Sequence, residues 1–122
     1  MAIITETNPI LKILGADSHI YYAMENKFQS FFYIKPKFET LFEDEEEKIT
    51  TICHCSDLGG STIFLGTDNG LIYFIDRKSK SVTARKKYHE PNSILALTHK
   101  NETLISADSE SKVIIFNTKT LQ

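Results

Sequence analysis

The chain has 122 residues, of which 41% are hydrophobic and 25% are charged, as in an average globular domain. The net charge of -2 is too small to attract nucleic acid or an anionic membrane by itself. No apolar run approaches the ~20 residues that span a bilayer, and the start lacks the basic and apolar regions of a secretory signal. We therefore expect a protein of the nucleus or cytoplasm that is not secreted and has no membrane span.

Short apolar segments alternate with polar turns along the whole chain. These segments are rich in β-branched and aromatic residues, which favour strands. No stretch of about 11 residues has the apolar period of a helix, so we expect helix content close to zero. In chain order, the expected strands and hairpins cover residues 10–14, 24–35 (a hairpin), 38–42, 49–55, 65–76 (a hairpin), 82–88, 94–98 and 106–117 (a hairpin).

The hairpins recur at a fixed spacing. In segment 65–76, a strand ends near Thr67, a turn covers residues 68–70, and a second strand follows. The Asn-Gly pair in this turn supplies the positive φ angles of a tight hairpin. The same form returns 41 residues later in segment 106–117 and, more loosely, 41 residues earlier in segment 24–35. Such a period predicts a repeat architecture, with units of about 1–47, 48–90 and 91–122.

Four-stranded units of about 40 residues are typical of β-propellers. Segment 67–76 resembles the end of a WD repeat, and His89 stands near the family's Gly-His position. Three pairs hold the place of the family's Trp-Asp dipeptide: Ile34 with Lys35, Ile75 with Asp76, and Phe116 with Asn117. Because the chain has no tryptophan, the family's network of His, Asp, Ser or Thr, and Trp side chains is not expected to be complete. The resemblance implies an incomplete WD-repeat-like propeller of about three blades, the third lacking its outer strand.

An arc of three blades does not close, because propellers need about four to eight. Its two end faces would expose apolar side chains. We therefore expect an N-terminal fragment, a truncated gene product, or one part of a propeller whose remaining blades come from a longer chain or another subunit. The competing interpretation is a small closed barrel or sandwich of about 11 strands, which would make the 41-residue period accidental.

A basic strip surrounds the expected strand 82–88. Its members are Arg77, Lys78, Lys80, Arg85, Lys86 and Lys87. Lysine and arginine commonly protect an edge strand against mispairing. The functional alternative is a weak or indirect contact with the phosphates of tRNA, or with a protein partner.

Other clusters favour structural roles. The acidic run 43–47 reads as a solvated, mobile connection, or else as a contact for a basic partner. Cys53 and Cys55 point to one face of a strand and His54 to the other, which is only half of a structural zinc site. His89 reads as a structural histidine, since no serine or cysteine nucleophile sits in a recognisable motif. We therefore expect no enzyme, no catalytic residue, no cofactor and no metal.

The order of segments is similar to the N-terminal blades of the non-catalytic WD-repeat subunit that accompanies tRNA guanine-N7 methyltransferase. The segments that carry this similarity are 8–11, 85–88, 91–94 and 103–108. The resemblance implies a protein-interaction scaffold whose partner is a methyltransferase subunit that binds the methyl donor and tRNA. It transfers no binding residue to this chain. The alternative is the N-terminal propeller of a vesicle-tethering or coat subunit, which a long helical repeat downstream would favour.

Overall fold

The computed structural model describes residues 3–55, 57 and 60–120, and within these residues it contains strands and no helix. The strands form three antiparallel sheets, here called blades 1, 2 and 3, each a meander in which consecutive strands pair. Blade 1 contains β1 (Lys12–Ala16), β2 (His19–Ala23), β3 (Lys27–Phe32) and β4 (Lys37–Glu43). Blade 2 contains β5 (Ile49–His54), β6 (Thr62–Thr67), β7 (Ile72–Asp76) and β8 (Ser81–Lys86). Blade 3 contains β9 (Ile94–Lys100), β10 (Thr103–Asp108) and β11 (Val113–Asn117).

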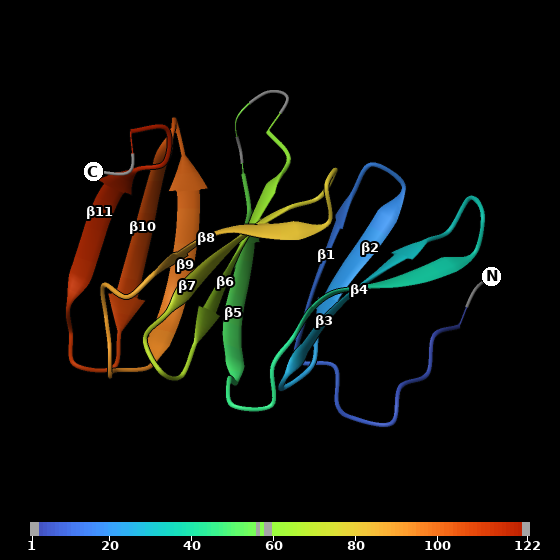
Figure 1. Cartoon of the computed structure of the whole chain (residues 1–122), viewed down its shortest axis with the longest axis horizontal. Coiled ribbons are helices and arrows are strands. Elements are labelled where there is room, and N and C mark those ends of the chain that lie inside the picture. The colour runs from blue at the N-terminus through green and yellow to red at the C-terminus, as the bar shows by residue number, and fades with distance from the viewer. Residues whose placement is uncertain (1–2, 56, 58–59, 121–122) are drawn as a thin grey trace.

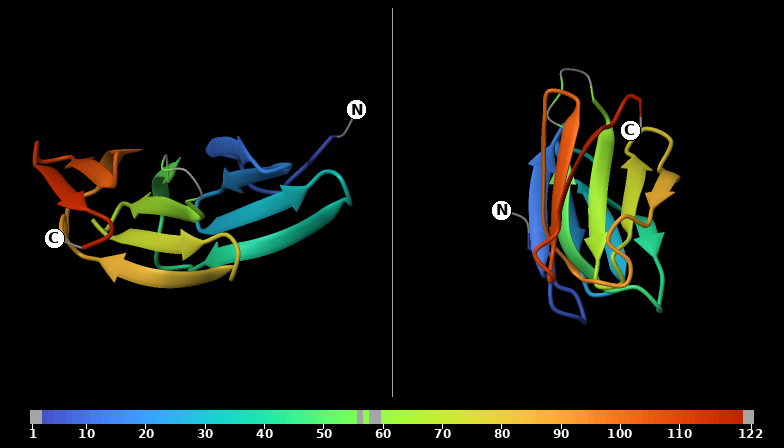
Figure 2. Two further views of the ribbon diagram at one scale, coloured as in Figure 1. Left: turned by 90° about the horizontal axis from the view of Figure 1, so that it is seen from above. Right: turned by 90° about the vertical axis from the view of Figure 1, so that its left-hand side faces the viewer.

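The three blades stand side by side in chain order, from blue to red in Figure 1. Seen from above in Figure 2, they follow an open arc and not a closed barrel. The chain is thus an incomplete propeller, and among the described residues the third blade has three strands without the outer one, as the sequence predicts. The expected unit bounds begin at residue 1 and end at residue 122, which both lie outside the described residues.

The two central strands of blade 2, β6 and β7, are buried on both faces, and this explains their continuous apolar residues. Side chains alternate between the two faces of a strand. In β6, Ile63 and Leu65 pack toward blade 1, whereas Phe64 packs toward blade 3. In β7, Ile75 packs toward blade 1 and Phe74 packs toward blade 3. The central strands of a sheet between two neighbours therefore carry apolar residues on both faces, as in other sheets that are covered on both sides.

A segment before β1 covers part of the other face of blade 1. Ile4 packs against a small cluster that contains Tyr22, Met24 and Phe31. The Tyr22 hydroxyl donates a hydrogen bond to the Glu6 carboxylate. Burial, together with this carboxylate, raises the pKa of Tyr22, so the phenol stays protonated and remains a donor.

The 41-residue period holds for the central hairpins of blades 2 and 3. The β6–β7 turn is closed by a hydrogen bond from the Thr67 nitrogen to the Leu71 oxygen, at 3.1 Å. The β10–β11 turn is closed in the same way, from the Asp108 nitrogen to the Lys112 oxygen at 3.0 Å. The two turns have the same length, so equivalent residues lie 41 positions apart.

The period fails in blade 1, where the turn is one residue shorter. There the Met24 nitrogen bonds the Lys27 oxygen at 2.8 Å. Phe32 lies opposite the first residue of β2, which is the place that Asp76 and Asn117 occupy in the other blades. Ile34 and Lys35, which the period places there, lie instead in the turn between β3 and β4. That expectation is wrong because equivalent residues of blades 1 and 2 lie 43 positions apart before this turn (Met24 and Thr67) and 44 after it (Phe32 and Asp76), and the shorter turn accounts for one residue of the difference from 41.

The β6–β7 turn also differs in detail from the expected hairpin. Of the Asn-Gly pair, Gly70 alone has a positive φ, of 84°. A Cβ at this position would lie 2.5 Å from the backbone nitrogen of Glu90 and from the carbonyl carbon of His89. Glycine is therefore needed both for its backbone conformation and because the linker into blade 3 passes directly over it.

Candidate functional site

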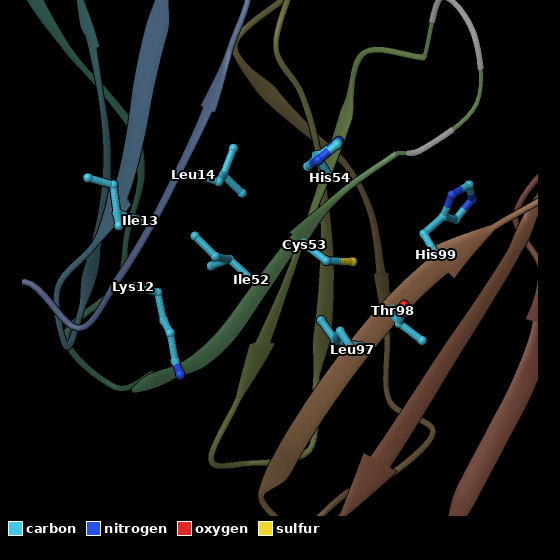
Figure 3. Close-up of a pocket in the computed structure, with 9 residues that line it drawn as sticks. All are labelled: Lys12, Ile13, Leu14, Ile52, Cys53, His54, Leu97, Thr98 and His99. Atoms are coloured by element: carbon cyan, nitrogen blue, oxygen red, sulfur yellow. The ribbon is translucent and has the colours of Figure 1, made fainter.

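A shallow groove of about 330 Å³ runs along the innermost strands of the three blades. Figure 3 shows its walls, which β1, β5 and β9 provide. Its lining is formed by Lys12, Ile13, Leu14, Ile52, Cys53, His54, Leu97, Thr98 and His99. The lining combines aliphatic side chains with the polar groups of Lys12, His54, Thr98 and His99 and is open to solvent, so it is suited to contact with a protein surface.

Blade 3 contains a buried serine–histidine–aspartate network. His89 Nδ1 lies 2.7 Å from a carboxylate oxygen of Asp108, and Nε2 lies 2.6 Å from Ser106 Oγ. These three side chains have the relative arrangement of a catalytic triad. Their residues are, however, only 1%, 4% and 1% exposed for His89, Asp108 and Ser106, so no substrate reaches the serine. The expected structural role of His89 is confirmed.

The network joins the linker before β9 to strand β10 and to the turn after it. The hydrogen bond from His89 holds the pKa of Asp108 below its usual value, so this group is a carboxylate. The same carboxylate accepts hydrogen bonds from the backbone nitrogens of Glu110 and Lys112, at 2.8 and 3.1 Å. Phe116 stands at the family's tryptophan position and packs edge-on against Tyr88, at 5.1 Å between ring centroids. Three of the four members of the family's network are thus present.

Asp108 and Ser106 are the partners of His89 that sequence reasoning missed. No motif in the sequence marks an aspartate for orienting the histidine, whereas Asp108 does so in the structure. The signal was present in Ser106-Ala-Asp108, which the 41-residue period aligns with the end of β6.

The structure divides the basic strip between the two ends of β8. Arg77, Lys78 and Lys80 lie at its start, and Arg85, Lys86 and Lys87 lie at or just beyond its end. A strand of six residues is about 17–20 Å long, so the two groups do not form one cluster. Lys78, Arg85 and Lys87 are exposed and available to a ligand. Contact of these residues with tRNA stays a prediction.

Two members of the strip bind carboxylates of blade 1. Arg77 Nη1 lies 2.6 Å from Asp17, Nη2 donates to the Gly60 oxygen at 3.0 Å, and the guanidinium lies over the Tyr21 ring at 5.8 Å. Lys80 Nζ lies 2.6 Å from Glu39. The Arg77 side chain is only 14% exposed, so it belongs to the interface between blades 1 and 2.

One residue of the acidic run is turned inward. Glu47 is 5% exposed, and its carboxylate accepts hydrogen bonds from Asn69 Nδ2 at 2.6 Å and from the Tyr73 hydroxyl at 3.4 Å. Burial, with the charge of Glu47, raises the pKa of Tyr73. The expectation that the whole run is solvated is therefore wrong for Glu47, which connects the blade 1–blade 2 linker to the β6–β7 hairpin.

The two cysteines face blade 3, where they pack with Phe64 and Leu97. Figure 3 shows the sulfur of Cys53 on the side of β5 that faces β9. Burial raises the pKa of the Cys53 thiol to about 12, so it is protonated at neutral pH. Cys55, in contrast, lies beside Asp57 and His99, with donor atoms of all three residues within 4.8 Å of one another. Burial lowers the pKa of His99, so its imidazole is neutral at pH 7.

Comparisons with known proteins agree with this geometry. No family model matches the chain, and no curated protein matches it. It is similar to a chain of the mitotic checkpoint complex, with a TM-score of 0.71 and 16% identity over 94% of this chain and 41% of that one. It is also similar to the Neurospora crassa Pan2 WD40 domain, with a TM-score of 0.73 and 13% identity over 93% and 34% of the two chains. The computationally designed Ika8 protein gives a TM-score of 0.69 and 14% identity over 86% and 32%.

The chain thus spans about a third to two fifths of the length of these structures. The described residues contain no helix that is long and apolar enough to cross a membrane. Three meander sheets, their arrangement in an open arc and the likeness to WD40 domains together establish an all-β, incomplete WD-repeat-like β-propeller.

Proposed function

We propose that this chain is a non-enzymatic protein-interaction scaffold. The observation that carries the proposal is the exposed apolar face of blade 3. Ile105, Val113 and Ile115 alternate with buried neighbours along β10 and β11, so they share one face, and they are 36%, 60% and 65% exposed. An exposed apolar face of this kind is suited to packing against the surface of another protein.

The more specific proposal is the non-catalytic WD-repeat subunit that supports a tRNA (guanine-N7) methyltransferase. Its support is the order of segments along the chain, together with a fold in which the polar network of blade 3 is buried. Chemistry would then lie on the partner subunit, in the nucleus or cytoplasm. The exposed cations Lys78, Arg85 and Lys87 would add a weak, salt-sensitive contact with tRNA phosphates.

The test is co-purification of the tagged chain with the catalytic methyltransferase subunit, using two matched variants. Ile115→Asp places a charge on the apolar face of blade 3, and we expect it to reduce capture at least about tenfold. Ile34→Asp changes a residue of nearly equal exposure, 63% against 65%, in the turn between β3 and β4, away from both the groove and blade 3, and we expect it to keep capture. Equal capture with both variants would contradict a role for this face.

The two levels of the proposal fail separately. If the methyltransferase subunit does not co-purify, but Ile115→Asp removes another protein that the chain retains, the scaffold role stands and the methyltransferase assignment is wrong. If the chain retains no protein under any condition, the scaffold role is wrong as well.

A further inference from the structure

Three side chains with metal-binding atoms meet where blade 2 packs against blade 3. Cys55 and Asp57 follow β5, and His99 lies in β9. Their sulfur, carboxylate oxygen and imidazole nitrogen all lie within 4.8 Å of one another. The sequence contains no Cys-x-x-Cys pair or other common zinc spacing, so only the packing of the two blades brings this set together.

Two of the three donors are oriented by neighbouring groups. One oxygen of Asp57 accepts a hydrogen bond from the Glu102 nitrogen at 3.2 Å, and the other lies 3.9 Å from His99 Nε2. The His99 side chain is fully buried and stacks on Phe64, at 5.2 Å between ring centroids. Its Nε2 also contacts the Thr118 hydroxyl at 3.2 Å, the position that a metal ion would take over. Because their surroundings already hold these side chains in place, they lose little further conformational entropy when a metal ion binds, and this favours binding.

The spacing suits a small tetrahedral ion. Zinc binds thiolate sulfur at about 2.3 Å and nitrogen or oxygen at about 2.0–2.2 Å, which places tetrahedral ligands roughly 3.3–3.8 Å apart. The oxygen of Asp57 and the nitrogen of His99, at 3.9 Å, are already close to this separation. A mixed set of sulfur, nitrogen and oxygen donors is suited to zinc, whereas calcium and magnesium prefer oxygen alone.

We propose that Cys55, Asp57 and His99 bind one zinc ion that joins blade 2 to blade 3. The fourth position would hold water, because a groove of about 310 Å³ opens beside Cys55 and Asp57. Lys119 also lines this groove, but its ammonium is paired with Glu102 at 2.9 Å and is 68% exposed, so it does not block the site. On binding, the Cys55 thiol loses its proton to solvent and the thiolate coordinates the ion.

The experiment titrates Zn²⁺ alone into the chelator-treated 122-residue chain, with Co²⁺ as a spectroscopic probe of sulfur ligation. We expect one ion per chain, a higher thermal midpoint, and a thiolate-to-cobalt charge-transfer band. Cys55→Ser should lower zinc affinity at least about tenfold and abolish the band. Cys53→Ser is the matched control, since it removes the other thiol that faces blade 3 and should leave both the affinity and the band unchanged. Asp57→Asn keeps an acceptor for the Glu102 nitrogen and should lower affinity without unfolding.

Circular dichroism of each variant separates loss of the site from loss of the fold. The proposal is wrong if zinc shows no saturable binding, or if Cys53→Ser lowers affinity as much as Cys55→Ser. It is also wrong if the ion binds at one per two chains, because the site would then lie between copies and not between blades.

Discussion

Gly66 in β6 packs against Ile94 of blade 3 and beside Thr51 of its own blade, and Gly66→Ala tests that packing. A Cβ there would lie 2.8 Å from Ile94 Cγ2 and 2.9 Å from Thr51 Cγ2. Carbon atoms in ordinary contact are about 3.5–4.0 Å apart, so the new methyl group overlaps both side chains by more than half an ångström. Ile94 is fully buried and has no room to withdraw.

The expected loss of stability follows from two opposing effects. Overpacking of a filled core costs about 1–3 kcal/mol. Restricting the unfolded chain by Gly→Ala returns about 0.4–1 kcal/mol. We therefore expect Gly66→Ala to lower the free energy of unfolding by about 1–2 kcal/mol, as the difference of these effects. Urea unfolding followed by circular dichroism and tyrosine fluorescence measures it.

Gly15 in β1 is the matched control, because it is also a strand glycine. A Cβ at Gly15 meets nothing closer than the His19 carbonyl oxygen, at 3.9 Å. Gly15→Ala should therefore stabilise the chain by about 0.4–1 kcal/mol through the unfolded state alone. Adding Thr51→Ser removes one of the overlapped methyl groups and should reduce the effect of Gly66→Ala. Equal stabilities of the two alanine variants, or no effect of Thr51→Ser, would refute this account of the interface.

Three further outcomes are expected from urea unfolding. Hydrogen bonds from serine groups hold the pKa of Asp76 at about 2, against 3.8 for a free side chain. The stabilisation that this carboxylate gives the folded chain is therefore complete above pH 4 and is lost as the pH falls toward 2. Asp76→Asn should make the urea midpoint of unfolding depend less on pH over this range. His89→Phe leaves two buried polar side chains without their partner, so it should cost more than the ~1 kcal/mol of an average substitution. His19→Phe, at a partly exposed position, should cost less. Arg77→Ala should destabilise the chain more than Lys80→Ala, because the Arg77 side chain is 14% exposed and packs on a tyrosine ring. The Lys80 side chain is 48% exposed, so its ion pair stabilises the fold by at most about 1 kcal/mol. The reverse order of the two effects would contradict this account.

Local patterns predicted the strands well, because a strand's form depends on near neighbours. Alternation and turn residues located the hairpin 65–76, which the structure resolves as β6, a turn and β7. Continuous apolar residues in these strands correctly indicated a sheet, although they did not say which side chain faces which neighbour. The period was misleading at Ile34 and Lys35, because one constant shift cannot register the greater spacing of 43 to 44 residues between blades 1 and 2.

By itself, the sequence determined the repeat: meander units, the missing fourth strand of the third unit, and a structural histidine at position 89. The tertiary structure decided which distant groups meet. It paired Arg77 with Asp17, turned Glu47 inward, and placed His99 beside Cys55 and Asp57. Strand pairing within a blade is local in sequence, whereas contacts between blades join residues tens of positions apart. Such contacts depend on how the sheets twist and pack against one another, and no pattern along the chain records that geometry.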